Sequence, residues 1–250
     1  MENQKTINVS LPFFLLMAVL QTVTTLIPGV ILLDSKKGTT IPIFSFIVYL
    51  LLCELFQYFV RLANKNGTSI ATPVFIIKLI ISCFFIFSIS SKTVVPYGVI
   101  LACYELFQFL CYSRKFNYMH SFLYLITNSF FKGIVFNQLF IIYYPFNFTL
   151  DMMKPFIFSF LVILLYTALL QGFYSSLTGY YLFLSTLLLL STYGFLVYSF
   201  LSNQINLIQI LLILACNLFF FIQFGKTSNP KKKEFILSLF ILSMLCIFYI

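Results

Sequence analysis

The chain has 250 residues, of which 61% are hydrophobic and only 8% are charged. A soluble domain carries about 25% charged residues, so this composition excludes a globular protein with a water-facing surface and predicts an integral membrane protein. The formal net charge of +9 comes from basic residues in short connectors, which favours membrane lipids over nucleic acid as partners. Because the chain has 16 Tyr and no Trp, we expect Tyr to supply any aromatic belt at the headgroups.

The apolar segments predict an all-α, polytopic transmembrane helix bundle with about nine spans. A spanning helix needs about 20 mostly apolar residues. Runs of this kind cover 11–33, 41–63, 72–90, 93–112, 119–143, 154–174, 177–200, 204–224 and 234–250. They do not alternate with period two, as the strands of a membrane barrel would. No stretch is left for a soluble domain, so we expect a single transmembrane domain over residues 1–250.

The connectors predict the orientation. If the N-terminus is cytoplasmic, nine connector Lys and Arg residues lie on the cytoplasmic side and four lie outside. Under the positive-inside rule this bias favours a multi-pass protein of the cell membrane with its N-terminus inside. The first ten residues lack the basic region and cleavage site of a signal peptide, so we expect the first apolar run to remain as a span. We interpret the basic run Lys231–Lys233 as a topology anchor.

Four ionisable residues lie within the predicted spans: Glu54, Lys78, Glu105 and Lys132. Such residues are expensive in hydrocarbon and usually face the interior of a helix bundle. The two glutamates belong to a short internal repeat, in which Glu-Leu-Phe-Gln begins once at Glu54 and again at Glu105. Both predicted helices run in the same direction, so the two carboxylates are expected at similar depth.

The spacing of the polar residues predicts shared helix faces. Glu54, Gln57 and Arg61 are three and seven residues apart, and Glu105, Gln108 and Tyr112 repeat this spacing. We expect the Lys78 ammonium to reach Glu54 and the Lys132 ammonium to reach Glu105. Either these are neutralising pairs that fix helix packing, or they line a polar cavity, open to the cytoplasm, that receives a charged headgroup or a proton.

Other polar residues favour structural roles. We expect interhelical hydrogen bonds from the amides that lie within spans, namely Asn128, Asn137, Gln138 and Gln171. The single histidine, His120, is expected to face solvent or headgroups. The six cysteines form no CxxC motif or Cys/His cluster and are expected to be small apolar residues. No HExxH, GxSxG or Walker motif is present.

The layout resembles the UbiA superfamily of intramembrane prenyltransferases. The resemblance lies in the nine predicted spans, in Tyr58-Phe59 followed by Lys65-Asn66-Gly67, and in the stretch from Tyr112 to Tyr118 with Gly133 beyond. The family's aspartate-rich motifs are not retained. Gln57 and Arg61 stand in the first motif, and the stretch that matches the second, 169–176, contains no carboxylate.

The resemblance implies that an isoprenoid or lipid substrate binds within the bundle, either for prenyl transfer or in a non-catalytic relative. It implies no evident cofactor, with Mg²⁺ required only if transferase activity is retained, because Mg²⁺ favours carboxylate ligands. Together with the buried polar residues, it gives one set of candidate substrate-binding residues: Glu54, Gln57, Arg61, Asn64, Lys65, Lys78, Glu105, Gln108, Arg114, Lys115, Tyr118, Lys132 and Gln171.

Two other functions remain open. The chain could be a permease-type or accessory subunit of a peptide or lipid exporter, which would require a separate ATPase as partner because no nucleotide-binding motif is present. It could also be a purely structural assembly protein. The two functions differ in the structure that we expect: a lipid-binding bundle would have a cavity among its helices, whereas an exporter subunit would have cytoplasmic coupling helices.

Overall fold

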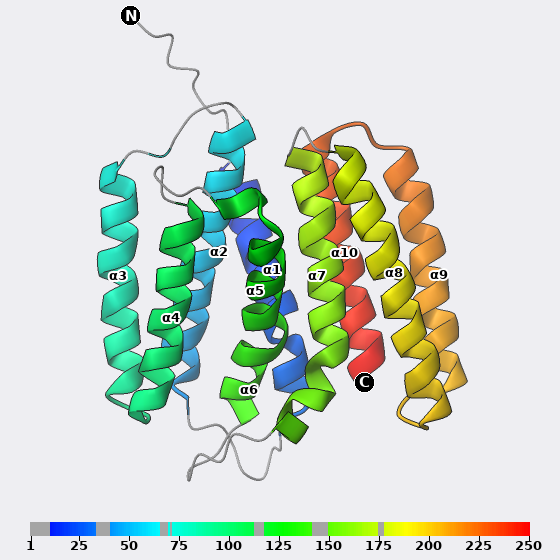
Figure 1. Cartoon of the computed structure of the whole chain (residues 1–250), viewed down its shortest axis with the longest axis horizontal. Helices are drawn as coiled ribbons and strands as arrows, with labels where there is room; N and C mark the ends of the chain where they lie inside the picture. The colour runs from blue at the N-terminus through cyan, green and yellow to red at the C-terminus, as the bar shows by residue number, and fades with distance from the viewer. Residues whose placement is uncertain are drawn as a thin grey trace, which may run out of the picture. The chain divides into compact units, whose positions relative to one another are not determined.

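The computed structural model describes residues 11–33, 41–65, 70, 72–112, 118–141, 150–174 and 178–250. Among these residues the secondary structure is helical and contains no strand, which confirms the predicted all-α class. The helices group into two compact units (Figure 1). Unit 1 comprises the described residues up to 22 and those within 39–124, and unit 2 comprises those within 23–38 and 125–250.

Unit 1 is made of packed helices, of which α3 and α4 are joined by a short turn. Its elements are the first half of α1 (Leu11–Ile31), α2 (Ile43–Lys65), α3 (Thr72–Ser90), α4 (Val95–Tyr112), the short helix η1 (Tyr118–His120) and the start of α5 (Phe122–Phe130). The helix α3 packs against both α2 and α4. Pro73 and Pro96 lie in the first turns of α3 and α4, where a missing backbone N–H costs little. The turn between them confirms the boundary predicted near residue 92.

Unit 2 contains the remaining helices. They are the end of α1 and of α5, then η2 (Phe131–Val135), α6 (Phe136–Ile141), η3 (Leu150–Phe156), α7 (Ile157–Tyr174), α8 (Thr178–Leu201), α9 (Leu207–Gly225) and α10 (Pro230–Tyr249). The helix α7 packs against α8, α10 and η2, and α9 packs against α10. The core is aromatic: Phe158 of α7 stacks on Phe248 of α10 with ring centroids 3.9 Å apart.

Local signals set the ends of α8, α9 and α10. Asn203 follows α8 with φ 57°, a left-handed conformation that Asn tolerates better than most residues. At the start of α9 the Gln209 side chain accepts a hydrogen bond from the Asn206 backbone N–H at 2.7 Å. The Asn229 side chain caps α10 by accepting from the Lys231 backbone N–H at 3.0 Å, and Pro230 opens the helix.

A π-helical turn interrupts the run from α5 to α6. The turn packs against α7 so closely that a Cβ on Gly133 would lie 2.6 Å from the Phe160 Cα. Asn137 stabilises it, because its side-chain nitrogen donates to the backbone oxygens of Lys132 and Gly133, both at 3.1 Å. Its side-chain oxygen accepts from the Gly29 N–H of α1 at 2.7 Å. The interhelical hydrogen bond predicted for Asn137 is thus confirmed.

Among the described residues, seven helices are long and apolar enough to cross a membrane, with mean hydropathies from 1.3 to 2.3. They are α1, α2, α3, α4, α7 together with η3, α8 and α9. The predicted fifth run is the bent segment from α5 to α6, and the ninth is α10, which starts with three Lys and Glu234. An integral, multi-pass membrane protein is therefore supported, while nine spans, the cytoplasmic N-terminus and the cell membrane stay predictions.

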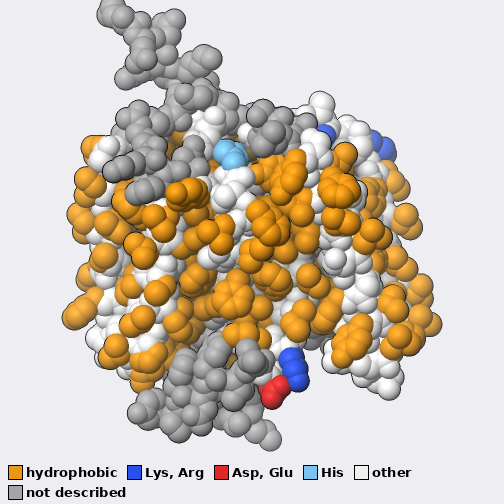
Figure 2. Space-filling model, in the orientation of Figure 1, with side chains coloured by type: hydrophobic (Ala, Val, Ile, Leu, Met, Phe, Trp, Pro, Cys, Tyr) orange, Lys and Arg blue, Asp and Glu red, His pale blue; other side chains and the backbone are white. Residues whose placement is uncertain are grey.

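The surface supports the same conclusion. Hydrophobic side chains cover most of the visible face (Figure 2), and in α3 and α9 only 17% of the spanning residues are buried. Three Tyr near helix ends, Tyr118, Tyr180 and Tyr198, are at least half exposed, as expected for residues at the headgroups. Other Tyr residues are fully buried in unit 1, so Tyr is not used for a belt alone.

Candidate functional site

A buried ion pair lies in the interior of unit 1. The Lys78 ammonium of α3 contacts one carboxylate oxygen of Glu105 on α4 and donates to the Gln108 side-chain oxygen. All three side chains are almost fully buried. The prediction that Lys78 reaches Glu54 was therefore wrong, because the carboxylate that contacts Lys78 is that of Glu105. Gln108 and Glu105 are three residues apart on α4, so one helix face presents both acceptors to the same ammonium group.

Tyr and Cys side chains extend this pair toward α2. The Cys53 thiol of α2 lies 3.5 Å from the Glu105 Oε1, and the Tyr49 hydroxyl donates to the Leu101 backbone oxygen at 3.4 Å. Gln57 donates from Nε2 to the Tyr104 hydroxyl at 2.8 Å. Because Cys53 precedes Glu54 directly, its contact with Glu105 places the two copies of the internal repeat at similar depth.

A second polar group lies nearer the end of α2. The Arg61 guanidinium donates to the Gln21 side-chain oxygen of α1 at 3.3 Å and stands 5.6 Å from the Tyr58 ring centroid. The hydroxyls of Tyr112 and Tyr124 are 2.9 Å apart and link α4 to the start of α5. Arg61 is 4% exposed, so this candidate residue is buried among the helices of unit 1.

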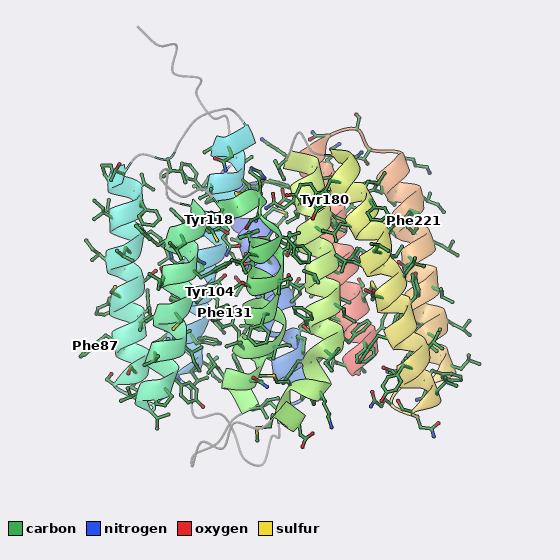
Figure 3. The ribbon with its side chains drawn as sticks, in the orientation of Figure 1. Phe87, Tyr104, Tyr118, Phe131, Tyr180 and Phe221 are labelled. Carbon is green, nitrogen blue, oxygen red and sulfur yellow. The ribbon has the colours of Figure 1, made fainter. Side chains whose placement is uncertain are left out.

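An apolar groove runs between α3 and α4, and its lining includes Glu105 of the ion pair. It has a volume of about 590 Å³ and is lined by the outward faces of both helices. Glu105 is part of its lining and Phe87 and Val95 lie toward its other end. Figure 3 labels Phe87 pointing outward from α3, whereas Tyr104 points into unit 1. The groove therefore connects the lipid-facing surface with a buried charged pair.

The ends of this groove are defined by side chains. At the end near the pair, the Phe75 ring of α3 meets the Phe109 ring of α4 with centroids 5.5 Å apart. At the other end, α3 and α4 approach closely, since a Cβ on Gly98 would lie 2.8 Å from the Ser90 Oγ. From the pair, the groove runs toward the turn between α3 and α4, away from the Arg61 end of unit 1. A cavity open to the cytoplasm stays a prediction.

The remaining candidate residues have separate places. Glu54 is buried in unit 1, Asn64 donates to the Met119 sulfur at 3.3 Å, and Tyr118 is half exposed. Lys132 and Gln171 are buried in unit 2. Arg114 and Lys115 lie outside the described residues, as does the side chain of Lys65.

Sequence reasoning missed the buried Tyr residues of unit 1. Tyr49, Tyr58 and Tyr104 are fully buried, whereas the only role expected for Tyr was an aromatic belt at the headgroups. A signal was available for two of them. Tyr58 directly follows Gln57, and Tyr104 directly precedes Glu105, so each belongs to a stretch already identified as polar.

No family model, curated protein or solved structure matches this chain. The resemblance to the UbiA superfamily therefore rests on the residues quoted above and stays a proposal.

Proposed function

We propose that unit 1 binds an isoprenoid or another lipid with a phosphate headgroup, with its apolar tail between α3 and α4 and its headgroup at Lys78. The observation that supports this proposal is an apolar groove whose lining includes Glu105, the carboxylate partner of the buried Lys78 ammonium. An amphiphile needs this combination, because its tail must leave water and its headgroup must meet a compensating charge. The proposal concerns binding and does not depend on a chemical step.

The dimensions of the groove suit a single tail. From Val95 to Glu105, α4 advances about 15 Å at 1.5 Å per residue. This is about half of a 30 Å hydrocarbon core. The volume of about 590 Å³ also falls within the about 300–1,000 Å³ of ordinary ligand pockets. A tail lying there would contact apolar side chains on both sides and remain in contact with lipid on the third.

The headgroup chemistry involves exchange of partners. An anionic phosphate at Lys78 would replace the Glu105 carboxylate, since both compete for the same ammonium group. A buried carboxylate that loses its cation costs several kcal/mol, so the phosphate must bind the Lys78 ammonium more strongly than Glu105 does.

The contact between the Phe75 and Phe109 rings lies on the path by which a headgroup would reach Lys78. Lys78 lies six residues into α3, about 9 Å along the helix from its start. Phe75 and Phe109 close the space between this start and the pair. Rotation of these two rings would admit a headgroup from the membrane–water interface. The tail would enter between α3 and α4 from the surrounding lipid.

The described residues do not suit Mg²⁺. They contain no group of three or more His, Cys, Asp or Glu able to hold a metal ion. Glu105 is already paired with an ammonium group, and its neighbour Cys53 is not a ligand that Mg²⁺ favours. We derive no metal-dependent step, and a prenyltransferase remains the finer proposal implied by the resemblance alone.

The exporter subunit remains an alternative from the sequence. No specific contact among the described residues favours it over lipid binding. Co-purification of an ATPase from native membranes would favour this alternative.

The test measures binding of labelled farnesyl diphosphate and labelled phosphatidic acid to the purified full chain, with and without Mg²⁺. We expect Ala102→Phe to weaken binding, because Ala102 lines the groove. Ile80→Phe is the matched control, since Ile80 is a lipid-exposed α3 residue outside the lining. The two ligands distinguish an isoprenoid from a glycerolipid. If neither ligand binds, or if both variants lose binding equally, the proposal is wrong.

A further inference from the structure

A second groove lies in unit 2, between α9 and α10. It has a volume of about 640 Å³ and an apolar lining, with Gln223 and Ser243 among the few polar side chains. From Leu212 to Gln223, α9 advances about 16 Å at 1.5 Å per residue. One leaflet of a 30 Å hydrocarbon core is about 15 Å deep, so the groove has the length of one acyl chain in one leaflet.

Beyond the Gln223 end of the groove, each of the two helix faces that form its walls carries a lysine. On α9, Phe219 and Gln223 line the groove. Lys226 follows Phe219 by seven residues and Gln223 by three, so it lies on the same side of the helix. On α10, Ile236 lines the groove, and Lys232 precedes it by four residues. The two helix faces that form the groove therefore both end in an ammonium group.

The positions of these lysines are fixed by nearby structure. Lys226 caps the end of α9, and Lys226 and Lys232 are exposed. The Lys233 ammonium lies 4.7 Å from the Phe224 ring centroid, which joins the first turn of α10 to the last turn of α9. The N-terminus of α10 adds the partial positive charge of a helix start.

The nearest acidic residue does not neutralise the cluster. Glu234 is fully buried and accepts a hydrogen bond from the Tyr174 hydroxyl of α7, so its carboxylate faces the interior of unit 2. Lys226, Lys232 and Lys233 thus form a basic mouth, defined by these three residues, above an apolar groove. A topology anchor would require only the positive charge. It would not require an apolar groove on the same helix faces as the lysines.

We propose that this groove holds one anionic glycerophospholipid, with an acyl chain between α9 and α10 and its phosphate at the basic mouth. Gln223 lies one turn below Lys226, where its amide can donate to an ester carbonyl of the glycerol backbone. The site lies wholly in unit 2 and is independent of the lipid proposed for Lys78. A partner helix would need acidic groups at one end to match three lysines, whereas the phosphate of a membrane lipid is attracted by all three.

The test is native mass spectrometry of the full chain in neutral detergent, titrated with phosphatidylglycerol or with phosphatidylcholine of the same acyl composition. We expect one phosphatidylglycerol to bind more tightly than phosphatidylcholine. Removal of the charge by Lys226→Gln, Lys232→Gln and Lys233→Gln should weaken it about fivefold for each lysine. Lys92→Gln, an exposed lysine of unit 1, is the control for net charge.

A second pair of variants separates the groove from the charge. Ala215 lines the groove, so Ala215→Phe fills it and should reduce binding at least tenfold with all lysines in place. Leu218 is an exposed α9 residue outside the lining, so Leu218→Phe should leave binding unchanged. Equal binding of both phospholipids, or full binding to the Ala215→Phe variant, would overturn the proposal.

Discussion

Removal of the Lys78 ammonium should destabilise unit 1 more than an ordinary substitution does. In the Lys78→Met variant the Glu105 carboxylate, 6% exposed, loses its cation. Breaking a buried ion pair on one side costs about 3–5 kcal/mol, because an uncompensated charge remains buried. The Gln108 side-chain oxygen loses its donor as well. We expect a loss of about 3–5 kcal/mol in the free energy of unfolding.

The double variant shows whether the charge is the cause. In Lys78→Met/Glu105→Leu no charge remains, and replacing a buried ion pair by apolar residues is often close to neutral. The Gln108 amide is still left without its partner, which costs about 1–3 kcal/mol. The double variant should therefore be more stable than Lys78→Met alone, which is the reverse of additive behaviour.

The assay is reversible unfolding in mixed micelles of neutral detergent and dodecyl sulfate, followed by circular dichroism. Lys92→Met serves as the control, because Lys92 is exposed in the turn after α3 and should change stability by less than about 0.5 kcal/mol. The reasoning is refuted if Lys78→Met stays within 1 kcal/mol of the parent, on the order of an exposed pair, or if the two substitutions simply add.

Two further predictions concern the π-helical turn. Gly133→Ala should destabilise unit 2 by about 1–3 kcal/mol or more, because the added Cβ would meet the Phe160 backbone. Gly194→Ala is the control: a Cβ there has nothing within 4 Å, so this variant should be more stable by up to about 1 kcal/mol. The same unfolding assay compares the two variants. Asn137→Leu should cost at least about 1–3 kcal/mol, since the Gly29 N–H loses its acceptor, and a stability equal to the parent would contradict this.

Much of the fold was predictable because hydrocarbon imposes a simple rule on sequence. Each spanning helix satisfies its own backbone groups and needs a minimum apolar length, so the seven long apolar helices found among the described residues coincide with predicted runs to within about three residues at each end. Even the boundary near Lys92 was correct, since Pro96 and a charge mark it. The bent segment from α5 to α6 was not predicted, because the π-helical turn depends on tertiary contacts of Gly133 with α7.

The candidate site was predictable in composition but not in pairing. Glu54, Gln57, Lys78 and Glu105 are all buried, as intramembrane polar residues should be. Sequence position gives the depth of a residue along its helix, but it does not give the rotation of one helix against another. The partner of Lys78 was wrong for this reason, and the groove between α3 and α4 was missed because it is formed by apolar residues.

The most direct test of lipid binding in unit 1 is photo-crosslinking of the full chain in neutral lipid nanodiscs with a photoactivatable isoprenyl diphosphate, followed by peptide mapping. The proposal predicts crosslinks within Leu79–Ser90 and Val95–Phe109, which line the groove, and their loss in Lys78→Met/Glu105→Leu and on addition of unlabelled diphosphate. Crosslinks spread equally over the exposed faces of α8 and α9, without competition, would contradict it.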